Sequence, residues 1–283
     1  MKQTIENSKI SLMAIEERRK LGYLDNVPIA DNIFDVLEKL KINLIEYPIF
    51  SNDKVSFSAV ITYLNYDGSE LVFIGLNSAD YYDKQIFSIA HELYHFYARN
   101  STHLNKNIES QATQIENEAN LFAAEFLLPQ ESLKNIIISD FNELDLKNIN
   151  KRTILRFIIR LQCKWGLPYK SLVKRLDEIG AISSKQYSGL YNIDERNFES
   201  DYFKVGLVTD ESTFKKLNTI TKNIRTSSKN IETIIRNFED KIIDEDTFRL
   251  TLALFNLKPE DFGFEINVSQ NDIDELKAFY EID

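Results

Sequence analysis

Two of the three histidines in the sequence lie four residues apart, in the stretch IAHELYHFY from Ile89 to Tyr97. On a helix, residues at i and i+4 lie one above the other, so His91 and His95 can present two imidazoles to one metal ion. Glu92 lies about 100° round the same helix, where it can reach a water molecule on that ion but cannot easily bind the ion itself. The H-E-x-x-H pattern on a helix therefore indicates metal-dependent peptide hydrolysis, with two ligands and a general base.

A third ligand is needed, and the sequence offers two candidates. His103 lies eight residues after His95. The metzincin pattern instead places its third histidine six residues after the second, with a glycine three after it. Ser101 and Ala98 occupy those two positions here. The metzincin pattern therefore fails, and His103 is better explained as a loop residue.

The second candidate is Glu116, in the stretch ENEANLFAAEFLLP that ends at Pro129. A helical wheel places Glu116 on an apolar arc, while Glu118 and Glu125 lie roughly opposite and face away. The residues of this arc are Ala119, Phe122, Ala123, Phe126 and Leu127. A carboxylate on a packing face is costly unless it is paired or bound to a metal, and the small alanines let this helix approach the histidine helix. Asn120, one turn later, is placed to hydrogen-bond the second ring nitrogen of a histidine ligand.

The predicted metal site has three ligands, His91, His95 and Glu116, and leaves the fourth position to water. Glu92 is the predicted general base. Candidate donors to the developing oxyanion are the polar side chains nearby, which are Tyr94, Tyr97 and His103. The sequence favours none of the three. In the alternative interpretation, both histidines are ordinary buried residues of an apolar helix and Glu116 is a surface acid.

The order of these motifs resembles the ImmA/IrrE family of metallopeptidases. Members have a HExxH helix followed by a helix reading E-x-x-A-N-x-F-A-A with a closing L-L-x-P, and both are present here as FSIAHELYHFY and ENEANLFAAEFLLP. The lead-in VFIGLN and DKQIFSIAHE fits as well, so the resemblance covers about residues 10 to 135. One departure is Tyr94, where the family commonly has glycine. This change is expected to alter packing or cleft width more than chemistry.

The resemblance implies a zinc-dependent endopeptidase in which His91, His95 and Glu116 bind Zn²⁺, with Mn²⁺ as an alternative metal, and Glu92 is the catalytic base. It also implies a substrate, because relatives cleave a helix-turn-helix repressor site-specifically and so release genes for mobile-element transfer or stress response. Two rival functions stay open: a DNA-binding regulator that keeps a metal only for structure, and a toxin–antitoxin type of interaction protein. An open fourth ligand position favours the enzyme, because structural zinc is usually closed by four protein ligands.

The wider pattern predicts an α+β fold that is mainly helical with a small β-sheet, and the resemblance implies that this part is a zincin-like metallopeptidase domain. A helix-turn-helix-like helical module and an acidic helical C-terminal region follow, and the three predicted domains span residues 1–135, 136–195 and 196–283. Periodicity predicts helices at 4–21, 30–40, 83–99 and 109–128, and strands at 43–47, 57–64 and 71–76. A turn signal at 65–69 joins the last two strands into a hairpin, and the polar segment 192–201 is a candidate linker.

Residues 151–175 form a basic stretch with eight lysines and arginines and no acid. Its helix, tight break and second helix resemble the helix-turn-helix that follows the peptidase part in relatives. A DNA contact would run through Arg156 and Arg160. The favoured interpretation is a basic face that packs against acidic surface of the same chain, because helix-turn-helix geometry often serves packing alone.

Composition restricts the remaining classes of function. The net charge of −10 and the pI of about 5.0 argue against non-specific nucleic-acid binding by the whole chain. The single cysteine, Cys163, cannot form an internal disulfide, which favours a reducing compartment. The N-terminus lacks the apolar core of a signal peptide, and no stretch approaches the ~18 apolar residues of a membrane span. We therefore expect a cytoplasmic protein with no membrane partner.

Overall fold

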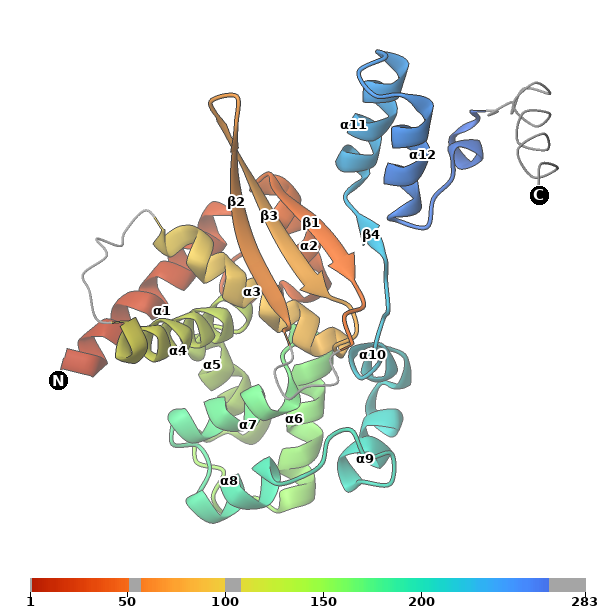
Figure 1. Ribbon diagram of the computed structural model, residues 1–283. Helices are drawn as coiled ribbons and strands as arrows, with labels where there is room; N and C mark the ends of the chain where they lie inside the picture. The colour runs from red at the N-terminus through yellow and green to blue at the C-terminus, as the bar shows by residue number, and fades with distance from the viewer. Residues whose placement is uncertain (1, 51–56, 100–107, 265–283) are drawn as a thin grey trace. The chain divides into compact units, whose positions relative to one another are not determined.

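The structure, a computed structural model, describes residues 2–50, 57–99 and 108–264 (Figure 1). The chain divides into two compact units, residues 1–223 and 224–283. The predicted domain boundaries at 135 and 195 both lie inside the first unit. The predicted α+β fold is confirmed, because helices dominate and a small sheet lies in the N-terminal part of the chain. Among the described residues, no helix has both the length and the apolar composition needed to cross a membrane.

Every helix and strand predicted before residue 130 is present, with its ends within two residues of the prediction. These elements are α1 (Lys2–Lys20), η1 (Ala30–Asn32), α2 (Ile33–Lys39), β1 (Ile42–Tyr47), β2 (Ala59–Tyr66), β3 (Ser69–Asn77), α3 (Tyr82–Ala98) and α4 (Ile108–Leu127). The first unit continues with α5 (Gln130–Phe141), α6 (Lys151–Trp165), α7 (Tyr169–Glu178), α8 (Ser184–Tyr191), α9 (Asp201–Thr209) and α10 (Glu211–Leu217).

The sheet of the first unit places an edge strand beside α3. β2 and β3 form the predicted antiparallel hairpin, and β1 pairs with β3 in parallel, so β2 lies at the edge. Asp67 and Gly68 connect the hairpin with φ of 48° and 72°, the positive angles that a two-residue type I′ turn requires. α3 packs against β2 and β3 on one side and against α4 on the other (Figure 1).

Small residues let α3 and α4 pack closely, and a buried arginine fixes the end of α4. Ala119 and Ala123 of α4 are fully buried. Arg18 of α1 is also fully buried. Its guanidinium donates to the carbonyl oxygens of Phe126, at the C-terminal end of α4, and of Val27, the latter at 2.6 Å. Helix C-termini leave carbonyls without intrahelical partners, so Arg18 satisfies groups that would otherwise be buried and unpaired.

The start of α3 is held by a buried polar cluster that we call the α3 anchor: Asp83, Gln162 and Arg196. Asp83 has no exposed surface. Its carboxylate accepts hydrogen bonds from Arg196 Nη2 at 2.7 and 3.0 Å and from Gln162 Nε2 at 3.0 Å. The Arg196 guanidinium also lies 3.9 Å from the centre of the Tyr81 ring. The segment 192–201, a candidate linker in the sequence, is part of the first unit. Its Arg196 pairs with the buried carboxylate of Asp83.

The last residues of the first unit run alongside the loop that leads into α3. The Tyr82 N–H donates to the Thr219 carbonyl at 3.0 Å, and the Lys222 N–H donates to the Ser78 carbonyl at 2.9 Å. The Ser78 hydroxyl donates to the Asn223 carbonyl at 2.6 Å. The start of α3, the histidine helix, is thus held by residues from the C-terminal end of the first unit.

The basic stretch forms two helices, α6 and α7, with a short break between them. Gly166 ends α6 with a φ of 73°, a conformation that glycine adopts without strain. One face of α7 is buried, and its Arg175 pairs with buried Glu125 of α4 at 3.0 Å. Arg160 pairs with Asp140 of α5, and Lys170 lies 3.3 Å from Glu195. Several charges of the basic stretch are therefore paired with acids from other elements of the first unit.

The second unit, as far as residue 264, is a small helical body. It contains β4 (Arg225–Thr226), α11 (Ser228–Glu239), α12 (Glu245–Ala253) and η2 (Pro259–Phe262). The side chains of Ser227 and Asp244 accept hydrogen bonds from the first turns of α11 and α12. The rings of Phe238 and Phe248 stack with centres 4.2 Å apart.

Candidate metal centre and active-site cleft

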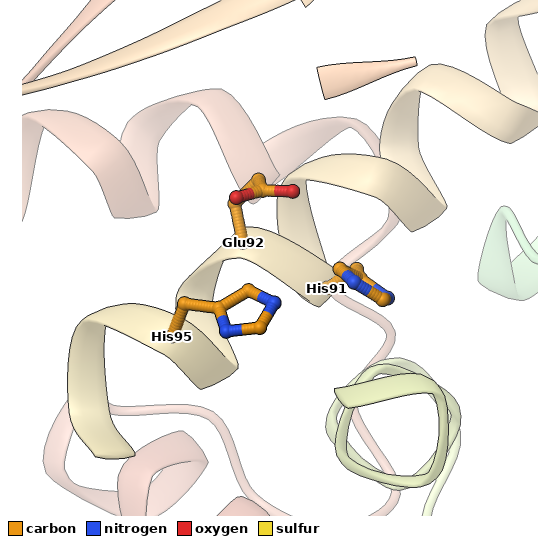
Figure 2. Close-up of side chains that lie close together, drawn as sticks. All are labelled: His91, Glu92 and His95. Atoms are coloured by element: carbon orange, nitrogen blue, oxygen red, sulfur yellow. The ribbon is translucent and has the colours of Figure 1, made fainter. Parts of the chain in front are cut away.

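α3 brings two imidazoles and a carboxylate together within two helical turns. The rings of His91 and His95 have centres 5.2 Å apart. His91, Glu92 and His95 each have one potential ligand atom that lies within 4.8 Å of the other two. Figure 2 shows the three side chains. The four-residue spacing causes this proximity, since it returns the chain to the same helix face.

α4 adds a second carboxylate to this group. Glu116 Oε2 lies 3.1 Å from His91 Nε2, and Glu116 Oε1 lies 3.9 Å from His95 Nε2. The two Nε2 atoms of α3 thus face one carboxylate group of α4. Two imidazole nitrogens and a carboxylate oxygen are a donor set that suits Zn²⁺ and leaves room for a fourth ligand.

The surroundings of Glu116 differ from the helical-wheel prediction. Its side chain is 58% exposed rather than packed, because the cleft between β2 and the α3–α4 pair opens beside it. Glu125, predicted to face away from the protein, is only 2% exposed, because α7 covers that side of α4 and supplies Arg175. Glu118 accepts a hydrogen bond from Tyr94 of α3 at 2.6 Å. A helical wheel shows which residues share a face of one helix, but it does not show which other helices pack against that face.

Asn120 orients the first histidine. Its Oδ1 lies 3.2 Å from His91 Nδ1, so a proton on Nδ1 can be donated to it and Nε2 keeps its lone pair. This tautomer points a lone pair toward Glu116 and the space between the helices. Hydrogen bonds of this kind fix ring orientation in metal sites.

Glu92 lies against the edge strand. It is 8% exposed, and its Oε2 accepts a hydrogen bond from the Ile61 N–H of β2 at 2.9 Å. Burial raises the pKa of Glu92, while nearby His91 and the Ile61 N–H oppose that shift. A raised pKa brings a carboxylate closer to the range in which a general base works well near neutrality.

His95 is biased toward the form that binds metal. Burial lowers the pKa of its imidazole, His91 acts in the same direction, and Glu116 opposes the shift. A lowered pKa favours the neutral ring, which is the protonation state that a metal ligand must have.

A cleft of about 640 Å³ contains this group. β2 and the residues before it form one wall, from Phe57 to Ile61, and α3 and α4 form the other. Tyr94 and Tyr97 are not among its lining residues. The Tyr94 hydroxyl is engaged by Glu118, and the Tyr97 hydroxyl is buried without a hydrogen-bond partner among the described residues. His103, the third candidate oxyanion donor, lies outside the described residues.

Comparison with known proteins gives the family. Residues 37–177 match the sequence profile of a peptidase family with the description IrrE N-terminal-like domain. The chain belongs to this IrrE-like peptidase family. No curated protein and no solved structure matches the chain. All four residues of the group, His91, Glu92, His95 and Glu116, lie inside the IrrE-like domain. Because the family is one of metallopeptidases, it implies a metal, and the donor set and the open cleft fit one.

Two contributors to the IrrE-like site were not visible in the sequence. Ile61 acts through its main-chain N–H, which no residue type reveals. Arg196 lies beyond the matched residues 37–177, in a polar segment where an arginine is unremarkable until its buried partner is known. For Ile61, the only sequence signal was the predicted hairpin, one strand of which includes this residue.

Proposed function

We propose that this IrrE-like protein is a zinc-dependent endopeptidase. The observation that carries the proposal is the convergence of His91, His95 and Glu116 at one wall of a cleft, with Glu92 beside them. In this proposal the three residues hold the metal, Mn²⁺ is the alternative ion, and Asn120 keeps His91 in the ligating tautomer.

The protein's own groups then divide the work of peptide hydrolysis. A bound zinc ion supplies Lewis acidity, which polarises the scissile carbonyl and acidifies a water molecule. Glu92 accepts the proton of the attacking water at its carboxylate and returns it to the leaving amine. The Ile61 N–H holds this carboxylate in place, so the base does not have to reorganise during the reaction.

The outer edge of β2 is the proposed binding surface for the substrate. No strand pairs with the outer edge of β2 among the described residues, and the Ile61 N–H points toward the cleft. An extended peptide can add to such an edge through main-chain hydrogen bonds, with side chains alternating between the two sides. This mode suits a segment inside a longer chain, because it needs no free terminus.

By resemblance to its family, the proposed substrate is a helix-turn-helix transcriptional repressor. Site-specific cleavage of that repressor would release mobile-element or stress-response genes, and it would place the peptidase in the cytoplasm. The pairing of Arg160 with Asp140 and of Arg175 with Glu125 supports the interpretation that α6 and α7 serve packing. Accordingly, we do not favour a DNA contact through Arg156 and Arg160.

A direct test mixes the purified full chain, loaded with zinc or manganese, with the repressor encoded beside its gene. We expect two repressor fragments, and their formation should stop when a chelator is added. The Glu92→Gln variant should keep its metal and lose cleavage. Glu131→Gln, which changes an exposed glutamate of α5, is the matched control and should cut at the wild-type rate. Cleavage by Glu92→Gln at the wild-type rate would show that the base is assigned incorrectly.

The same mixture tests the rival functions. Tight binding of the repressor without cleavage would support an interaction protein with a non-catalytic metal site. Binding to DNA that weakens with salt and is lost on changing Arg156 and Arg160 would support a DNA-binding regulator.

A further inference from the structure

A second hollow, of about 370 Å³, adjoins the active-site cleft. Both are lined by Phe87 of α3 and Asn120 of α4. Phe87 lies one helical turn before His91 on the same face of α3, so the hollow opens at the His91 end of the cleft. Its other walls come from further residues of α4, from Asn7 of α1 and from α7, including Ser171, Lys174 and Glu178. A peptide leaving the cleft at this end would pass directly into the hollow.

The hollow is lined by apolar, neutral polar and charged side chains. Phe87, Leu121 and Ala124 supply apolar surface, and Asn117 and Ser171 supply neutral hydrogen-bonding groups. This mixture suits a long side chain with an apolar stem and a polar head.

The charges around the hollow favour a cation as that head group. Arg175 is neutralised by Glu125 at 3.0 Å, and Lys174 lies 3.8 Å from Glu178. The remaining acid, Glu118, accepts hydrogen bonds only from neutral groups in the described structure: Tyr94 at 2.6 Å and Gln114 at 2.8 Å. These bonds do not cancel its charge, and each carboxylate oxygen has a second lone pair.

We infer that this hollow is a substrate subsite that binds a lysine or arginine side chain of the polypeptide being cut. The inference rests on the proposed peptidase function. Phe87 and His91 are four residues apart, or about 6 Å along the axis of α3, and an extended peptide rises about 3.3 Å per residue. The basic residue therefore lies on the order of two to four residues from the scissile bond. Glu118 provides the attraction, while Phe87 and Leu121 pack against the stem.

The test uses probes anchored at the metal, so that it needs neither the natural substrate nor cleavage. Peptide hydroxamates are prepared with extensions of two to four residues on either side of the chelating group. Each extension ends in lysine or in norleucine, its uncharged analogue. Dissociation constants are measured by calorimetry on the zinc-loaded full chain, the Glu118→Gln variant and the Glu131→Gln control. For one side of the chelating group, lysine should bind about two- to fivefold more tightly than norleucine to the wild type.

The variants decide whether Glu118 causes this preference. The relevant ratio is the dissociation constant of the norleucine probe divided by that of the lysine probe. Glu118→Gln should bring this ratio close to one, Lys174→Gln should increase it, and the control should leave it unchanged. Equal binding of lysine and norleucine in both series would overturn the subsite while leaving the peptidase function intact. If the hydroxamate without an extension fails to bind the zinc-loaded chain, the proposed metal site is wrong and this inference is lost with it.

Discussion

Replacing Arg196 with alanine tests whether the α3 anchor supports the active-site helix. The change removes the only cation that contacts the Asp83 carboxylate among the described side chains. Asp83 is fully buried, and it would keep only the Gln162 amide and the Lys84 N–H as donors. Breaking a buried ion pair on one side costs about 3–5 kcal/mol of unfolding free energy. Because the Arg196 side chain is 15% exposed, the lower end of that range is expected.

The pH dependence of this loss has a definite sign. Burial raises the pKa of Asp83, and Arg196 opposes that rise, so the variant has a carboxyl whose pKa is higher still. The folded state of the variant then binds the proton more readily than the unfolded state, in which the pKa is about 3.9. The deficit in stability is therefore largest above the raised pKa, and it shrinks as the pH falls through that value.

Urea unfolding followed by Trp165 fluorescence measures the effect, since this single tryptophan is buried in the first unit. The double variant Asp83→Asn, Arg196→Ala should be more stable than Arg196→Ala alone, because it leaves no unpaired buried charge. Arg19→Ala, which breaks an exposed pair with Asp25, is the control and should leave the midpoint nearly unchanged. A cost below about 1 kcal/mol for Arg196→Ala, or a double variant as unstable as the single one, would refute the reasoning.

Three further variants test the parts of the site separately. Asn120→Ala should weaken zinc binding by about 10- to 100-fold in competition with a chelating dye, because the first histidine loses its orienting partner; unchanged affinity would exclude this role. Ile61→Pro removes the N–H that holds Glu92, at an edge position where proline spares the pairing with β3, so kcat should fall about tenfold or more with metal affinity unchanged. Tyr94→Phe should leave kcat unchanged, since its hydroxyl bonds to α4 outside the cleft; a loss of about 100-fold would instead assign it to the oxyanion.

The sequence predicted those features that depend on local geometry. The period of apolar residues identified α3 and α4, and the turn residues identified the hairpin. The spacing of His91 and His95 determined a shared helix face before any tertiary contact was known. Such predictions succeed because a helix or a tight turn constrains residues only a few positions apart.

Features that depend on packing between distant segments were missed or misplaced. Glu125 and Arg175 are 50 positions apart in the sequence, and Asp83 and Arg196 are 113 apart. Neither pair leaves a periodic signal, because burial of a charge depends on which element covers it. The exposure of Glu116 has the same origin: a helical wheel shows that it lies on the side facing α3, but not that a cleft opens there.

The most direct test of the proposed metal site is a crystal structure of the zinc-loaded full chain with anomalous data collected at the zinc absorption edge. We predict one strong scatterer bound by His91, His95 and Glu116, at about 2.0–2.2 Å from a nitrogen or oxygen of each. A zinc ion bound without Glu116, or located away from α3 and α4, would contradict it.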